Sequence, residues 1–412
     1  MAGKAILIGA LDTKGVEFGF VKSKLEGMGV ETLVVDVGVL GDPAFPPDIG
    51  SGEVAQAGGT SLEALREAND RGAAVAAMTK GVSVVMERLL AEGVVGGVFG
   101  MGGTAGTTVG AAAMQAAPIG VPKLLVSTVA SGNTRPYVGV KDVVMMHSVV
   151  DIAGLNKLSS RILANAAYAL GGMILEKAKE PAAAAEKPTL GMTMFGVTTP
   201  CCNVVRELLE ARGYDLLVFH ATGAGGLAME ELIRAGYIQG VADVTTTELA
   251  DELVGGIFSA GPTRLEAAAD AGIPQVVSVG ALDMVNFGPP DTVPERFKGR
   301  KFYQHNPTTT LMRTTVEENA ELGKRLAEKL NRCRVAPVVV FPKGGVSLLD
   351  RPTFAFDGAE ERQALYDGIK RHLRSDIPFL EVDGDINDPA TATLIAEQLL
   401  ERLEGTRRGA TA

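Results

Sequence analysis

The sequence predicts an α/β protein built from two Rossmann-like, doubly wound domains with parallel sheets. Short, apolar, β-branched segments alternate with glycine- and threonine-bearing loops and with helices, as buried parallel strands and their crossover helices do. This series occurs twice, on either side of a polar, alanine-rich segment bounded by prolines. At 412 residues the chain also exceeds the size of one ordinary core. These observations together predict two domains that arose by an internal duplication.

The first half opens with a βαβ unit whose strands are apolar and short. Its first helix is amphipathic, and its third strand runs through glycines into a helix of small residues. The predicted elements of this half are strands at 5–9, 32–36 and 94–99 and helices at 16–28, 109–117 and 152–176.

A change in composition at residues 176–188 separates the halves. The segment is rich in alanine, lysine and glutamate, and prolines bound it, which is typical of a linker. We therefore expect an N-terminal nucleotide-binding domain over residues 1–180 and a C-terminal domain with a second ligand site over residues 188–412.

The second half repeats the pattern of the first, and residues 213–220 are a near-copy of residues 29–36. Pro200 and Pro262 each suit the first turn of a helix. Thr245 to Glu248 resembles a capping box at another helix start. The remaining predicted elements are strands at 190–195, 213–220, 241–244, 275–279, 338–341 and 379–383 and helices at 202–212, from 227 and from 389.

Composition and charge exclude several classes of function. Aromatic residues make up 5% of the chain, tryptophan is absent, and the formal charge is −10, so a nucleic-acid surface is not expected. The three cysteines have neither a disulfide nor a metal-binding spacing, and we expect no metal site formed by the protein alone. No stretch approaches a membrane span, and the N-terminus runs directly into a strand, so a cytoplasmic location is expected.

The loop after the third strand is the first candidate phosphate site. Gly102, Gly103 and Gly106 allow positive φ and a close approach of the backbone to a ligand. Hydroxyl groups and a helix start then offer hydrogen-bond donors to an anion, from Thr104, Thr107 and Thr108. The loop matches neither a Walker A motif nor a clean dinucleotide fingerprint. Close packing of helix on strand explains such glycines equally well.

The turn after the first strand is the second candidate. Thr13, Lys14 and Gly15 stand at a helix start, where a cation opposes the helix dipole unless an anion offsets it. Asp36, at the carboxyl end of the second strand, is placed to bond ribose hydroxyls or, alternatively, to cap the following turn. Asp12 suits an ordinary helix cap.

Three side chains of the second half are candidates for catalysis. His220 occupies the position that Asp36 has in the first half, and His305 lies in a polar loop that could line the same cleft. Asp283 follows a strand and could bind Mg²⁺ or a polar substrate, or simply form a turn. Cys201 and Cys202 are better explained as small buried residues of a helix than as nucleophiles.

Motifs spread over almost the whole chain resemble the ATP-binding domain family named after the tomato mosaic virus resistance protein. The matching stretches are residues 11–15, 102–107, 126–132, 149–152, 219–223, 245–249 and 280–286. The resemblance implies two Rossmann-like subdomains, ATP binding and a homodimer. It does not carry over antiviral binding, and it assigns no individual site residue.

Two functions from different classes follow. The first is an enzyme that binds ATP with Mg²⁺ and transfers a phosphoryl group to, or activates, a small polar or acidic metabolite. Hydroxyl-rich loops in both halves favour it. The second is an ATP-responsive regulatory or protein-interaction module without turnover. A nicotinamide-dependent oxidoreductase is a weaker third reading, because the dinucleotide fingerprint is missing. Nucleic acid and membrane are not expected as partners.

Overall fold

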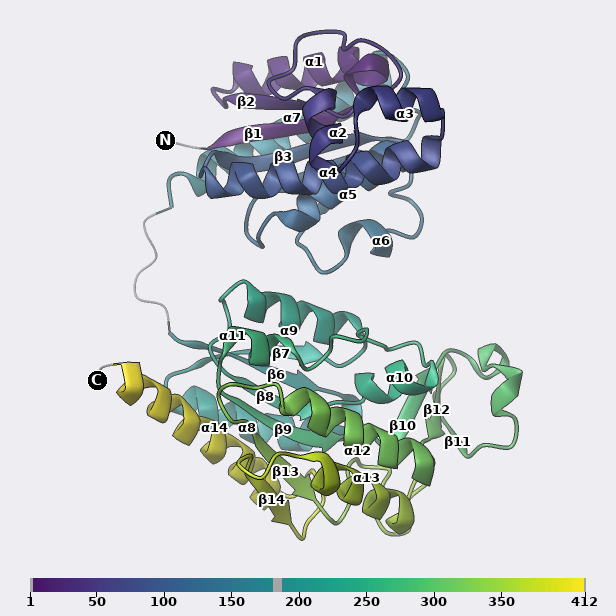
Figure 1. Cartoon of the computed structure of the whole chain (residues 1–412), viewed down its shortest axis with the longest axis vertical. Coiled ribbons are helices and arrows are strands. Elements are labelled where there is room, and N and C mark those ends of the chain that lie inside the picture. The colour runs from purple at the N-terminus through teal and green to yellow at the C-terminus, as the bar shows by residue number, and fades with distance from the viewer. Residues whose placement is uncertain (1–2, 181–186, 411–412) are drawn as a thin grey trace. The chain divides into compact units, whose positions relative to one another are not determined.

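The computed structural model describes residues 3–180 and 187–410, which form two compact units, Met1–Ala184 and Ala185–Ala412 (Figure 1). Both are α/β units with a parallel sheet, so the predicted fold class is confirmed. Residues 181–186 of the predicted linker lie outside the described residues; the helix before them ends at Lys177 and the strand after them begins at Thr189.

The N-terminal unit holds a five-stranded parallel sheet in the order β2-β1-β3-β4-β5. Its strands are β1 (Lys4–Gly9), β2 (Thr32–Asp36), β3 (Val95–Gly102), β4 (Lys123–Ser127) and β5 (Val144–His147). Its helices are α1 (Leu11–Gly27), α2 (Ser51–Ala57), α3 (Leu62–Ala68), α4 (Arg71–Ala91), α5 (Thr104–Ala116), α6 (Arg135–Val138) and α7 (Lys157–Lys177). One face packs on α1 and α7, the other on α2, α4 and α5, which gives three layers.

The C-terminal unit holds a six-stranded parallel sheet in the order β14-β13-β9-β8-β6-β7. Its strands are β6 (Thr189–Met194), β7 (Asp215–His220), β8 (Val241–Thr245), β9 (Gln275–Gly280), β13 (Val338–Pro342) and β14 (Phe379–Val382). Helices α8 (Thr199–Ala211) and α14 (Pro389–Ala410) cover one face. The other is covered by α9 (Ala224–Arg234), α10 (Glu248–Val254), α11 (Ala267–Ala271), α12 (Val316–Leu330) and α13 (Ala359–His372).

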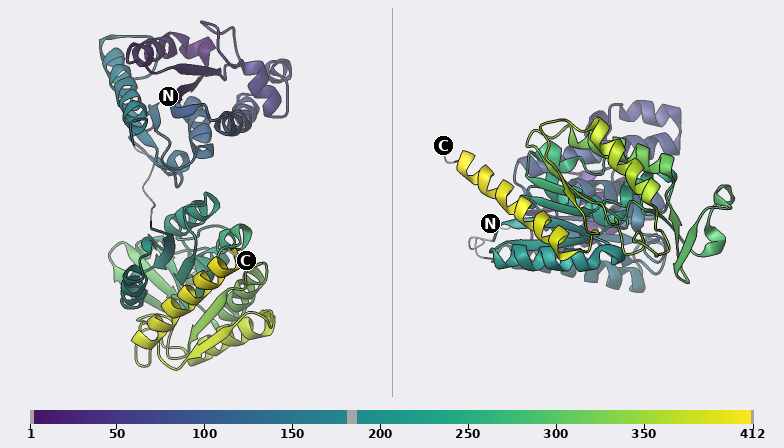
Figure 2. Two further views of the ribbon diagram at one scale, coloured as in Figure 1. Left: turned by 90° about the vertical axis from the view of Figure 1, so that its left-hand side faces the viewer. Right: turned by 90° about the horizontal axis from the view of Figure 1, so that it is seen from below.

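A small antiparallel sheet, β10-β12-β11, extends the C-terminal unit beyond the carboxyl ends of its main strands (Figures 1 and 2). It consists of β10 (Met284–Phe287), β11 (Phe302–Asn306) and β12 (Thr309–Arg313). The short 3₁₀ segments Pro290–Thr292 and Glu295–Phe297 precede β11, and a third, Gly196–Thr198, follows β6. All of β11 is exposed, whereas β10 is buried.

Several helices begin at other residues than the sequence pattern predicted. Helix α1 begins at Leu11 and α5 at Thr104, five residues before each predicted start. Helix α7 begins five residues later, because Asn156 caps it in a capping box. The helix expected from Pro262 is wrong: residues 262–265 form a turn, and α11 starts only at Ala267.

That turn carries Arg264 into the interior, where the side chain has no exposed surface. Its guanidinium group bonds both oxygens of Asp243, at 2.6 and 2.7 Å, and Oε2 of Glu248 at 2.7 Å. Glu248 also accepts hydrogen bonds from the backbone N–H groups of Gly223 and Gly226. The capping-box prediction for Glu248 is therefore wrong, because its carboxylate joins this buried ion cluster.

Helix α7 corrects one further expectation. By length and composition it could cross a membrane, although the sequence reading found no such stretch. In the structure one side of α7, including Leu163, Leu170 and Ile174, packs into the core beside α1. The helix is accordingly a core element of the N-terminal unit.

Candidate functional site

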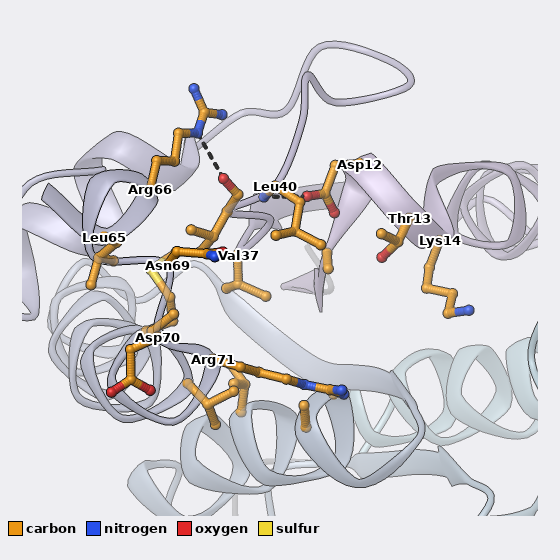
Figure 3. A pocket seen from close by; sticks show the side chains of 18 residues that line it. Asp12, Thr13, Lys14, Val37, Leu40, Leu65, Arg66, Asn69, Asp70 and Arg71 are labelled. Atoms are coloured by element: carbon orange, nitrogen blue, oxygen red, sulfur yellow. Dashed lines mark hydrogen bonds between the residues drawn. The ribbon is translucent and has the colours of Figure 1, made fainter. Parts of the chain in front are cut away.

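A cavity of the N-terminal unit lies where the order of its sheet reverses, between β1 and β3. The order 2-1-3-4-5 is that of flavodoxin-like sheets, which receive ligands at the carboxyl ends of the strands at this point. The cavity has a volume of about 680 Å³. Four segments line it: the β1–α1 turn, residues 37–40 after β2, residues 65–78 of α3 and α4, and the start of α5 (Figure 3).

The start of α1 brings the first predicted loop to this cavity. Thr13 is exposed, lines the cavity and directs its side chain inward (Figure 3). Oδ2 of Asp12 accepts hydrogen bonds from the N–H groups of Leu40, at 2.8 Å, and Gly41, at 3.1 Å. Oδ1 of Asp12 is buried and has no partner among the described residues. Asp12 thus holds the loop after β2 and keeps one carboxylate oxygen unbonded.

Lys14 also lines the cavity, but its ammonium group already has a partner. Nζ donates a hydrogen bond to the carbonyl oxygen of Ile152, in the loop before α7. One turn further along α1, Glu17 accepts a 2.6 Å hydrogen bond from the N–H group of Gly154. The positive charge of Lys14 at the helix start is therefore already offset by a carbonyl dipole within the protein, so it does not by itself require a bound anion.

The start of α5 brings the second predicted loop to the same cavity through Ala105, Gly106 and Val109. No side chain caps this helix, so its first N–H groups lack partners within the helix. The expected positive φ angles are wrong for Gly102, Gly103 and Gly106, none of which has one. A Cβ on Gly102 would lie 2.8 Å from Cα of Gly106, so these glycines permit strand and helix to pack closely.

The other residues predicted to bind the cofactor have structural contacts outside the cavity lining. Oγ1 of Thr107 is buried and lies 2.7 Å from Oγ of Ser127. Thr108 donates back to the carbonyl of Thr104 at 2.9 Å. Gly15 packs on Ala44, because a Cβ there would lie 2.4 Å from the Cβ of that alanine.

Asp36 was predicted either to bond ribose hydroxyls or to cap the following turn, and the structure shows contacts of the second kind. The side chain is 1% exposed, and Oδ1 accepts hydrogen bonds from the N–H groups of Leu11 and Gly38, both at 2.9 Å. Burial raises the pKa of this carboxyl group. Asp36 therefore ties β2 to the start of α1 and does not line the cavity.

The cavity wall also includes two polar residues, Arg71 and Asn69, that the sequence analysis did not identify. Arg71 is exposed, and its guanidinium group extends along the cavity wall below Thr13 (Figure 3). Within residues 3–180 this group has no hydrogen-bond or salt-bridge partner. Asn69, left-handed at φ 46°, ends α3 and also lines the cavity. Arg71 directly follows the helix cap Asp70, and this unfavourable place for a cation was the available signal.

The catalytic candidates of the second half separate in the structure. His220 and His305 line one pocket of about 180 Å³, together with Phe195, Thr222 and Asn306 among others. Asp283 is fully buried elsewhere and accepts a 2.8 Å hydrogen bond from Ser347. Burial raises the pKa of Asp283, and no metal-binding group of three ligands occurs among the described residues.

Two buried hydroxyl groups meet at the reversal point of the C-terminal sheet, between β6 and β8. Oγ1 of Thr198 and Oγ1 of Thr245 are 2.7 Å apart and fully buried. Cys202 lies against the same group, and burial raises the pKa of its thiol to about 12. Cys201 is buried too, which agrees with a structural role for both cysteines.

Fold and cavity together define a Rossmann-like α/β protein of two domains whose N-terminal sheet carries an open switch-point cavity. The chain belongs to the uncharacterised protein family UPF0261. The family's N-terminal domain matches residues 3–179 and its C-terminal domain matches residues 187–403. Family membership bears out part of the resemblance inferred from the sequence; ATP binding stays a proposal.

Relatives occur in bacteria and in a plant. A UPF0261 protein of Clostridium tetani is 53% identical over 98% of this chain and 100% of its own length. One of Rhizobium meliloti is 45% identical over 94% and 96%. The tomato mosaic virus resistance protein Tm-1(GCR237) of Solanum lycopersicum is 45% identical over 81% of this chain, which spans only 45% of that protein.

Among solved structures, a UDP-N-acetylglucosamine 2-epimerase from Listeria monocytogenes aligns over 67% of this chain and 79% of its own, at 14% identity and a TM-score of 0.23. At this TM-score the alignment supports no statement about activity.

Proposed function

We propose that the N-terminal unit binds ATP in the cavity between β1 and β3. One observation carries the proposal: two loops about ninety residues apart, each predicted to bind phosphate, line the same cavity at the sheet's reversal point. Two helix starts, of α1 and α5, contribute to its wall, and such starts attract anions.

The cavity wall has a polar and an apolar part, as a nucleotide site needs. Thr13, Lys14 and Arg71 supply a hydroxyl and two cationic groups for a triphosphate. Val37, Val39, Leu65, Val75 and Met78 supply an apolar surface for a base.

Magnesium bound with the nucleotide fits the same wall. The exposed hydroxyl group of Thr13 is a hard oxygen donor, which Mg²⁺ prefers. It would hold Mg²⁺ beside the phosphates, and the nearby carboxylate of Asp12, whose Oδ1 is buried, would stabilise the ion through its charge.

The proposed activity is an ATP-dependent reaction on a small polar metabolite that binds in the C-terminal unit. The pocket that joins His220 and His305 supports this version over a regulatory module without turnover, because a module that only senses ATP needs no second site. Steady-state ATP hydrolysis, measured alone and with a library of metabolites, separates the two. Absence of turnover under every condition would favour the regulatory module.

Calorimetric titration of the full-length protein with Mg·ATP tests nucleotide binding. Arg71→Ala removes a cation that has no partner in the described N-terminal unit, so we expect weaker binding with an unchanged melting temperature. The matched control is Arg161→Ala, an exposed arginine of α7 that does not line the cavity. Equal ATP affinity of both variants and the parent would contradict the proposed site.

A further inference from the structure

The four histidines of the chain fall into two classes. Nδ1 of His372 lies 2.8 Å from the carbonyl oxygen of Gly368, and Nδ1 of His147 lies 3.4 Å from that of Ser127. The imidazole groups of His220 and His305 have no hydrogen-bond partner within residues 187–410. Both of these imidazoles without a partner line the same pocket, although 85 positions separate them along the chain.

The two imidazoles reach the pocket from different elements. His220 ends β7 of the main sheet, and His305 belongs to β11 of the small antiparallel sheet. Asn306 follows His305 and also lines the pocket. Its Oδ1 accepts hydrogen bonds from the N–H and hydroxyl groups of Thr308, both at 2.9 Å, so the amide position is fixed. Its NH₂ group has no partner among the described residues.

Aromatic rings form one wall of this pocket. The rings of Phe195 and His220 have centroids 5.3 Å apart, and Phe258 meets Phe195 edge-on at 6.1 Å. The rings are inclined to one another, so this wall offers both aromatic faces and edges against which another ring can pack. The pocket volume of about 180 Å³ equals roughly six water molecules, which limits the ligand to about one ring with a substituent.

The lining also lacks full charges. Lysine, arginine, aspartate and glutamate are absent from the described residues around the pocket. Burial lowers the pKa of His220, so its imidazole is neutral at physiological pH. A carboxylate or phosphate would therefore meet no lysine or arginine in the lining that offsets its desolvation.

We infer that this pocket binds a small, uncharged, planar molecule that bears a hydrogen-bond donor and an acceptor, such as a carboxamide or a lactam. The two imidazoles and the Asn306 NH₂ group provide the complementary donors and acceptors, and the Phe195–His220 wall receives the ring. That this molecule is the second substrate of the ATP-dependent reaction rests on the proposed function; binding in the pocket does not. The sequence led us to expect a polar or acidic metabolite, and the pocket favours an uncharged polar one.

Nuclear magnetic resonance of the full-length protein with ¹³C-labelled histidine rings tests the inference without nucleotide. One Cε1–H resonance from each of the four imidazoles is expected, and single His→Gln variants assign them. Benzamide should shift the His220 and His305 resonances along one saturable curve and leave those of His147 and His372 in place. Benzoate differs from benzamide by its charge, and over the same range of concentrations it should produce no saturable shift of either resonance.

Substitutions sharpen the test. His305→Phe, at an exposed strand position, should weaken benzamide binding about tenfold, the size of one lost hydrogen bond, while His147→Gln should leave it unchanged. Equal binding of benzoate would overturn the uncharged class, and stoichiometric Zn²⁺ binding to both imidazoles would identify a metal site instead. No saturation by benzamide would refute the pocket as such. None of these results affects the Mg·ATP titration, so the two proposals fail separately.

Discussion

Asp251 makes the stability of the C-terminal unit depend on pH in a way that one substitution isolates. The carboxyl group lies in the core, where Oδ1 accepts 3.1 Å hydrogen bonds from the N–H groups of Phe258 and Asn286. Oδ2 accepts a 2.7 Å bond from the Asn286 side chain. Burial nevertheless dominates and raises the pKa of Asp251 from 3.8 to about 7.

The sign follows from proton binding. The folded chain holds the proton more tightly than the unfolded chain, so this group contributes stability that is fully present below the unfolded pKa and is lost as the pH rises through about 7. A rise from 3.8 to about 7 corresponds to roughly 4 kcal/mol, of which roughly 2.5 kcal/mol is lost between about pH 5 and pH 8.

Asp251→Asn keeps the shape and cannot ionise. Rotation of the Asn286 amide would present its Oδ1, which now has no partner, to the new NH₂ group. Urea unfolding of both proteins should therefore diverge: relative to the variant, the parent should lose roughly 2.5 kcal/mol between about pH 5 and pH 8. Parallel pH profiles of the unfolding free energy would refute the assignment. Buried carboxyl groups that do not interact with Asp251 affect both proteins alike and cancel in the difference; Glu248, whose charge contributes to the raised pKa of Asp251, is the exception.

Three further substitutions have expected outcomes. Lys14→Ala should weaken Mg·ATP binding by about 1.5–3 kcal/mol in calorimetry, and an unchanged dissociation constant would exclude Lys14 from the site. Asp36→Ala should lower the unfolding free energy by about 1–2 kcal/mol, because it removes the acceptor for Leu11 and Gly38; a lower ATP affinity at constant stability would instead restore the ribose interpretation. Arg264→Met leaves Asp243 and Glu248 uncompensated and should cost about 3–5 kcal/mol in urea unfolding, whereas an unaltered midpoint would contradict the buried cluster.

The main strands of the C-terminal sheet and three of the five N-terminal strands were predictable, because parallel strands buried on both faces are continuous apolar runs. Strands β4 and β5 were missed: β4 begins with a lysine and β5 is partly exposed, so neither is a plain apolar run. Residues 32–36 and the start of β8 at Val241 were placed without error. Helix starts were less predictable. Gly106 and the threonines Thr104 and Thr107 are poor helix formers, so the sequence indicated a loop, but close packing on β3 makes them the first turn of α5.

The candidate site was predictable only in the part that belongs to sequential βα turns. Thr13, Lys14 and Gly106 follow strands directly, and the parallel sheet brings their loops to one edge. Arg71 reaches the cavity from a helical excursion between β2 and β3, and no local pattern fixes where that excursion folds back. Arg264 was misplaced for a related reason: a charged residue after a proline is normally exposed, and its partners lie at 230, 243 and 248.

The hydroxyl pair of Thr198 and Thr245 marks a difference between the two halves at the reversal points of their sheets. Both sheets reverse their strand order in the same way; a cavity lies at the N-terminal reversal point, whereas the buried hydroxyl groups of Thr198 and Thr245 meet at the C-terminal one. The pocket described in the C-terminal half lies at the ends of β6 and β7, against β11 and β12. Two units with the same reversal of strand order therefore have their pockets at different places in the fold.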